Sequence, residues 1–252
     1  MSEPQELTFW DHLDILRGSI IRMLIVTALC GIIAFCFKDQ LFYIVLAPKD
    51  PGFITYKLLG TAPFNIKLVN VGLTEQFMVH MKTAFFFGFL CASPYVIYLL
   101  YKFISPALYR KERYYGIRIV MGGYVMFMVG VVVNYLLIFP LTVRFLGTYQ
   151  VSTDVQNMLS IQSYMDTLFM MSLIFGIVFE IPIISWLLAL FGLLKAEWMR
   201  HYRRQAIVVI LFVAAVITPT SDAFTMLIVS LPIWLLYEFS IWIVQTTNIQ
   251  KH

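Results

Sequence analysis

The sequence predicts an all-α membrane protein with six transmembrane helices, and its composition is the first reason. Of its 252 residues, 60% are apolar and 13% are charged, against roughly 45–50% and about 25% in soluble domains. The mean hydropathy is +0.82. A chain of this size cannot bury so much apolar surface, because even a compact fold keeps a large area facing its solvent. The solvent must therefore be lipid, which excludes a soluble enzyme, a disordered chain and a secreted disulfide scaffold.

Long apolar stretches are the second observation, because a spanning helix needs about 20 predominantly apolar residues. We expect a single membrane domain with spans at residues 19–37, 74–101, 116–143, 164–194, 205–217 and 223–244. Residues 1–18 predict a short amphipathic helix on the cytoplasmic face. Residues 38–73 contain three prolines and several apolar side chains, so we expect them to pack as an outer cap. The last two spans look short, and 205–217 would reach only about 20 Å.

The distribution of Lys and Arg is the third observation, and it orients the spans. With the N-terminus in the cytoplasm, twelve basic residues lie on the inner side and five in the outer loops. The five outer residues are Lys38, Lys49, Lys57, Lys67 and Arg144. This asymmetry favours cytoplasmic N- and C-termini. The net charge of +4 is too small to indicate binding to nucleic acid.

The polar residues offer little chemistry of the catalytic kind. The four histidines are scattered, the three cysteines form no C-x-x-C pair, and no P-loop or H-E-x-x-H motif is present. The nucleophile motif G-x-S-x-G is also absent. We therefore expect no catalytic residue, no metal and no cofactor, and the function is one of binding or transport.

One acidic residue, Glu180, falls in the middle of the predicted span 164–194. A charge at that depth is expensive, so this side chain should face protein or a water-filled cavity, or be protonated. Pro182 follows two residues later and is expected to kink the helix. Two interpretations stay open: a polar site in a concave membrane face, or a structural acid paired with a neighbouring helix.

The inner loop after the second span carries the densest mixture of charges and aromatic rings. Glu112 is a lone acid among four bases, close to Phe103 and Tyr109. From composition alone, this segment is also compatible with an ordinary positive inner loop in which Arg110 or Arg113 neutralises Glu112.

Several segments together resemble the TatC family, the multi-spanning receptors of the twin-arginine protein translocase. The matching segments are HLDILR at 12–17, ASPYVIY at 92–98, FISPALYRKER at 103–113, FGIVFEIP at 175–182 and LPIWLLYE at 231–238. Pro48 in the outer loop and Thr218-Pro219 with Asp222 also match. These segments follow the family's order along nearly the whole chain.

The resemblance implies a concave, glove-like bundle in the cytoplasmic (inner) membrane. It implies binding of twin-arginine signal peptides on folded cargo, assembly with the single-span proteins TatA and TatB, self-association, and transport driven by the proton-motive force. By position it assigns the signal-binding residues Phe103, Glu112, Asp14 and Arg17, the structural prolines Pro48 and Pro94, the intramembrane polar residue Glu180, and the TatA/TatB-binding residues Thr218, Thr225 and Met226.

Three positions depart from the family pattern. Ile15 occupies the usual Glu position, with Asp14 one residue earlier; the turn after Thr218 is one residue longer; and Met226 replaces a common Gln. A proton-coupled small-solute transporter using Glu180 is the alternative function. A purely structural scaffold, tolerant of replacements at Glu112 and Glu180, is a third.

Overall fold

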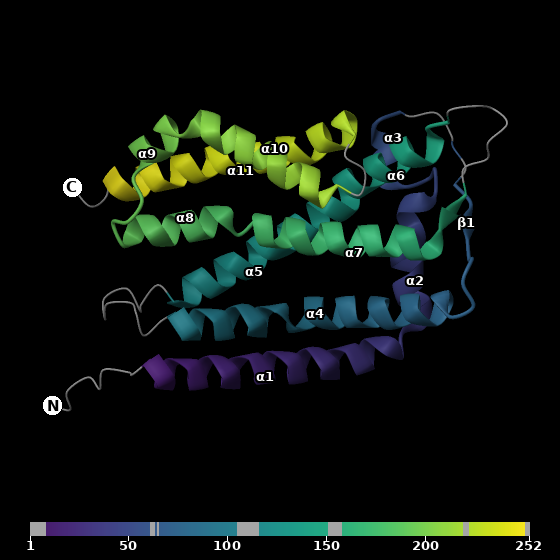
Figure 1. Ribbon diagram of the computed structural model, residues 1–252, viewed down its shortest axis with the longest axis horizontal. Coiled ribbons are helices and arrows are strands. Elements are labelled where there is room, and N and C mark those ends of the chain that lie inside the picture. Colours follow the sequence, from purple (N-terminus) through teal and green to yellow (C-terminus); the bar gives the residue numbers. More distant parts are fainter. Residues whose placement is uncertain are drawn as a thin grey trace. The chain divides into compact units, whose positions relative to one another are not determined.

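The computed structural model describes residues 9–60, 64, 66–104, 116–150, 158–218 and 222–249. Within these ranges the chain is almost entirely helical, apart from one pair of two-residue strands. The helices form two compact units (Figure 1). The first comprises Met1–Leu41 with His80–Tyr124, and the second comprises Phe42–Val79 with Val125–His252.

The first unit is built on the packing of α1 (Phe9–Phe35) against α4 (Glu75–Ile104). Gly88 lies so close to Gly31 that an added Cβ would stand 2.5 Å from the Gly31 backbone nitrogen. Four residues further along α1, the Phe35 ring stacks on His80 with centroids 4.0 Å apart. These two contacts make the helices antiparallel, and small residues at the crossing let the backbones approach as they do in membrane bundles.

The α4 helix stays continuous through Pro94, although proline has no N–H to donate to the carbonyl of Leu90. The hydroxyl of Ser93 donates to that carbonyl instead, at 2.7 Å. A hydroxyl beside the proline thus satisfies the acceptor that the proline leaves free, which is how membrane helices tolerate proline.

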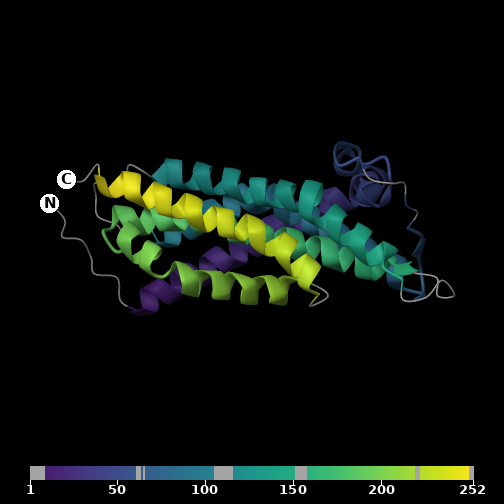
Figure 2. The ribbon, with the colours of Figure 1, turned by 90° about the horizontal axis from the view of Figure 1, so that it is seen from above.

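The second unit holds most of the remaining elements. Its outer segment contains α2 (Lys38–Leu46), which begins in the first unit, with η1 (Ala47–Lys49), α3 (Ile54–Leu58) and β1 (Leu68–Val69). The rest of the second unit contains α6 (Phe139–Thr148), β2 (Leu159–Ser160), α7 (Ile161–Val178), α8 (Ile181–Leu190), α9 (Ala196–His201), α10 (Arg203–Ile217) and α11 (Ala223–Ile249). The strands pair in parallel, with Leu68 opposite Leu159. The α11 helix packs against both α8 and α10 (Figures 1 and 2).

The third long helix changes its winding between α5 (Gly116–Val133) and α6. Residues Asn134–Ile138, labelled η4, form a π-helical turn. Pro140 follows directly, and its ring would clash with the carbonyl of Leu136 in a regular α-helix. The wider π turn relieves that clash. It also leaves the Leu136 carbonyl free to accept a hydrogen bond from the hydroxyl of Thr55 in α3.

Five helices of the described ranges are long and apolar enough to cross a membrane. They are Leu13–Phe35, Glu75–Phe103, Ile119–Thr148, Ile161–Leu190 and Ala223–Thr247. The remaining predicted span corresponds to α10, which has 15 residues and extends about 22 Å. The sixth span, the glove-like shape and the inner position of both termini stay predictions.

The expectation that the last helix is short is wrong, because α11 has 27 residues. Glu238 lies inside this helix, where its carboxylate pairs with Arg203 at 2.6 Å, and the helix continues to Ile249. A single charged residue that has a partner does not end a helix. The predicted boundary between residues 1–18 and the first span also has no break, since α1 is continuous from Phe9 to Phe35.

Candidate functional site

The predicted signal-binding residues that the structure describes belong to one end of the α1–α4 pair. Asp14 and Arg17 are exposed in the first turns of α1, and Phe103 is half-buried at the end of α4. Glu112 lies outside the described residues, in the segment that follows α4.

The antiparallel packing of α1 and α4 brings Arg17 and Phe103 to a similar height along the helix axes. Arg17 lies fourteen residues before Gly31, and Phe103 lies fifteen residues after Gly88. At 1.5 Å per residue these separations are about 21 and about 22 Å. Because Gly31 and Gly88 touch, Arg17 and Phe103 stand at similar distances from the crossing on neighbouring helices. The start of α1 and the end of α4 lie at the same end of this pair (Figure 1).

The two structural prolines have different surroundings. Pro48 is buried in η1, and its carbonyl accepts a hydrogen bond of 2.8 Å from the Tyr56 hydroxyl. The same hydroxyl makes a second hydrogen bond, 2.9 Å long, to the carbonyl of Pro140. Burial raises the pKa of Tyr56 well above its ordinary range. The phenol therefore stays protonated and keeps the outer segment tied to α6.

Glu180 lies at a break in the fourth long helix. The α7 helix ends at Val178, and α8 begins at Ile181 with Pro182 in its first turn, as expected for a proline kink. The Oε1 atom of Glu180 is buried and has no hydrogen-bond partner among the described residues. An unsatisfied carboxyl oxygen at membrane depth is costly. The role of Glu180 as an intramembrane polar site stays a prediction.

A second pair of buried polar side chains, which the sequence analysis did not predict, includes Ser172, two helical turns before Glu180. The amide nitrogen of Asn134, in the π turn, donates to the hydroxyl of Ser172 in α7 at 2.8 Å. Both residues are almost inaccessible, and the Asn134 Oδ1 has no partner in the described part of the chain. The signal was present, since Asn134 is an amide inside an otherwise apolar run. No comparable signal marks Ser172 as its partner.

Glu75, at the start of α4, joins two segments far apart in the sequence. Its carboxylate accepts hydrogen bonds from the backbone N–H groups of Val71 and Gly72, each at 2.8 Å. The other oxygen accepts from the Ser160 hydroxyl at 2.5 Å and the Gln162 N–H at 2.9 Å. The carboxylate thus lies at the N-terminus of α7, where the helix dipole favours an anion. Nothing in the sequence around Glu75 indicates these partners.

The predicted partner-binding residues surround the turn between α10 and α11. Asp222 caps α11 by accepting a hydrogen bond of 2.8 Å from the Thr225 N–H. Thr225 and Thr218 are buried, whereas Met226 is half-buried. The two threonines are therefore buried on either side of the connection from α10 to α11, whereas several apolar neighbours are exposed. These neighbours include Val216, Phe224 and Leu227.

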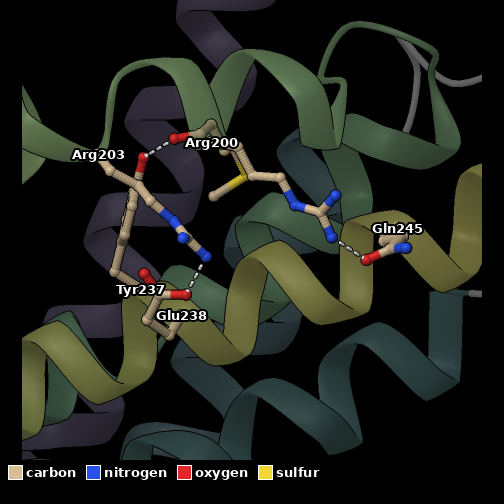
Figure 3. Close-up of polar contacts among 6 residues, drawn as sticks. Arg200, Arg203, Tyr237, Glu238 and Gln245 are labelled. Carbon is tan, nitrogen blue, oxygen red and sulfur yellow. Dashed lines mark hydrogen bonds and ion pairs between the residues drawn. The ribbon is translucent and has the colours of Figure 1, made fainter.

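At the other end of α10 and α11, polar contacts join these two helices to one another and α11 to α9 (Figure 3). Arg203 pairs with Glu238 at 2.6 Å, and Arg200 donates to the side chain of Gln245. The Tyr237 hydroxyl donates to the Met199 carbonyl at 2.8 Å. Exposed ion pairs contribute only about 0–1 kcal/mol. The apolar cluster beside them therefore carries most of the packing, and its buried members are Ala189, Ala196, Met199, Ile241 and Val244.

Long apolar helices with polar groups buried between them define a multi-spanning helical membrane protein. The family model described as "Sec-independent protein translocase protein (TatC)" matches residues 11–232. The chain therefore belongs to the TatC family, which is a component of protein transport and not an enzyme family.

Known relatives agree with this assignment over almost the full chain. The TatC protein of Deinococcus radiodurans is 34% identical, with 94% of this chain and 87% of that protein covered. The protein of the same name from Aquifex aeolicus is 31% identical, with 92% of each covered. A crystal structure titled "Twin Arginine Translocase Receptor- TatC" matches with a TM-score of 0.78 at 29% identity, covering 94% of this chain and 99% of that chain.

Proposed function

We propose that this protein binds the twin-arginine signal peptides of folded cargo and nucleates the assembly of TatA and TatB for export driven by the proton-motive force. The observation that carries the proposal is that Asp14, Arg17 and Phe103 lie at the same end of the α1–α4 pair. The chain continues from that end directly into the segment that contains Glu112.

The chemistry of these residues fits a signal with two arginines. A carboxylate can bind a guanidinium through two parallel hydrogen bonds, and such charge-assisted pairs are strong. We assign Glu112 to the arginine pair, with Asp14 in support, and Phe103 to the apolar residue that follows. Arg17 helps to position Asp14, three residues away on α1. With inner termini, this site faces the cytoplasm of the cell in which the cargo folds.

The second part of the proposal concerns the single-span partners. The α10 helix is too short to cross about 30 Å of hydrocarbon, so the membrane beside it must thin or another helix must shield it. We assign TatA or TatB to this face, near Thr218, Thr225 and Met226, with Glu180 as the polar group in the span. Membership in a translocase family argues against the alternative of a small-solute transporter.

Charge reversal in the inner loop tests signal binding. Glu112→Lys should abolish export of a twin-arginine reporter, because a positively charged side chain would then face the two arginines of the signal. A photo-crosslinker at position 112 of the otherwise unchanged chain should capture the signal peptide. Glu197→Lys is the matched control, since Glu197 is exposed in the first turn of α9. Normal export by Glu112→Lys, with no capture at position 112, would exclude this loop as the receptor site.

A further inference from the structure

The short helix α3, in the outer segment, has its polarity reversed. The side chains of Thr55 and Tyr56 are buried, and their hydroxyls donate to backbone carbonyls of the long third helix and of η1. The apolar side chains of Ile54 and Leu58, one turn apart, are 64% and 87% exposed. A helix on a water-facing surface shows the opposite arrangement, with apolar residues inward and polar residues outward.

The buried side of α3 and the residue before it are attached to a membrane span. Thr55 binds the carbonyl of Leu136 in the π turn, and the Phe53 ring contacts Tyr135 edge-on with centroids 5.6 Å apart. Leu136 and Leu137 belong to the span Ile119–Thr148, and both side chains are exposed. Apolar side chains exposed on a spanning helix face lipid or another membrane helix.

The position of this attachment along the span places it within the hydrocarbon. The span has 30 residues and is about 45 Å long, which is about 15 Å more than the hydrocarbon core. Leu136 lies twelve residues, or about 18 Å, before Thr148 at the end of the span. Even with the whole excess length at this end, Leu136 stays about 3 Å inside the hydrocarbon boundary.

We propose that α3 is embedded in the membrane leaflet on its side of the bilayer, where Ile54 and Leu58 contact phospholipid acyl chains. Exposed Lys57, next to Leu58, extends its ammonium to the phosphate groups at the surface. The outer segment is then an interfacial anchor attached to the third long helix, and not a lid in water. A lipid surface fits this face better than a protein partner, because α3 is attached to the span at a level that lies inside the hydrocarbon.

Collision measurements on spin labels test this proposal in the full-length chain. Cys30, Cys36 and Cys91 are first replaced by Ala, and a single nitroxide-labelled cysteine is introduced by Ile54→Cys or Leu58→Cys. The protein is reconstituted in vesicles of phosphatidylethanolamine and phosphatidylglycerol. Val129→Cys, about a third of the way along the same span, is the lipid-facing control, and Tyr149→Cys, just beyond the span, is the water-facing control. Circular dichroism and a single elution peak verify that each variant is folded.

Labels at positions 54 and 58 should collide with oxygen several-fold more often, relative to a water-soluble nickel chelate, than the label at 149. Their ratios should approach the ratio at 129. Nickel collisions as frequent as those at position 149 would show that α3 lies in water and would overturn the proposal. Dipolar broadening that disappears on dilution with unlabelled chain would show a protein interface at this face, and would overturn it as well.

Discussion

At the residue scale, hydroxyl groups and amides perform the work that water does in a soluble protein. Ser93 satisfies the carbonyl opposite Pro94, and Thr55 satisfies the Leu136 carbonyl freed by the π turn. The Asn134 amide nitrogen instead donates to the Ser172 hydroxyl on another helix. These contacts matter because an unpaired polar group has no alternative partner in hydrocarbon.

The Asn134–Ser172 contact predicts non-additive mutations. Ser172→Ala should lower the free energy of unfolding by about 1–3 kcal/mol, because it leaves the Asn134 amide buried without a partner. The double variant with Asn134→Leu should lose less than Ser172→Ala alone, since no unpaired polar group then remains at the crossing. Unfolding with SDS in mixed micelles measures the free energy of unfolding of the unmodified chain, the two single variants and the double variant, which together form a double-mutant cycle. Additive losses would show that the two side chains act independently.

At the scale of elements, close backbone contacts set the positions of the helices. A Cβ on Gly130 would stand 2.5 Å from the carbonyl oxygen of Phe175, which fixes the crossing with α7. A Cβ on Gly88 would stand 2.5 and 2.6 Å from backbone atoms of Gly31. Neither obstacle can rotate away, so an added methyl group must separate the helices.

The crossing of α1 and α4 gives a prediction that links stability to the signal site. Gly88→Ala should lower the free energy of unfolding by about 1–3 kcal/mol through overpacking. It should also weaken signal capture, because the two sides of the proposed site move apart. Gly18→Ala is the matched control: this position has open space, and alanine favours a helix by about 0.5–1 kcal/mol. Equal thermal stability of the two variants would contradict the close crossing.

The separate elements were easier to predict than their partners. Apolar runs revealed the long helices, and Pro182 indicated the break beside Glu180. The pairing of Glu238 with Arg203 was not predictable, because it depends on tertiary contact. The same holds for Glu75, whose partners Ser160 and Gln162 lie more than eighty residues away. Among the candidate site residues, the similar height of Arg17 and Phe103 could not be predicted, because it follows from the contact between Gly31 and Gly88.

At the scale of the whole molecule, α10 is shorter than the bilayer thickness that the long candidate spans match. The long candidate spans have 23 to 30 residues, whereas α10 has 15. Its length of about 22 Å falls short of the hydrocarbon core by about 8 Å. Mismatch costs a fraction of a kcal/mol per Å. As the predicted sixth span, the short helix would make a thin bilayer more favourable, by a total of about 2–4 kcal/mol.

Bilayers of different thickness test this mismatch. Four apolar residues inserted after Val209 lengthen α10 by about 6 Å and add roughly one turn, so its face toward α11 is nearly kept. The unfolding free energy of the extended variant should therefore shift in favour of long-chain over short-chain phosphatidylcholine nanodiscs, relative to the unmodified chain. The same insertion after Gly192, exposed in the connection between α8 and α9, controls for added length and should leave the thickness dependence unchanged. An identical dependence in all three proteins would show that the bilayer does not sense the length of α10.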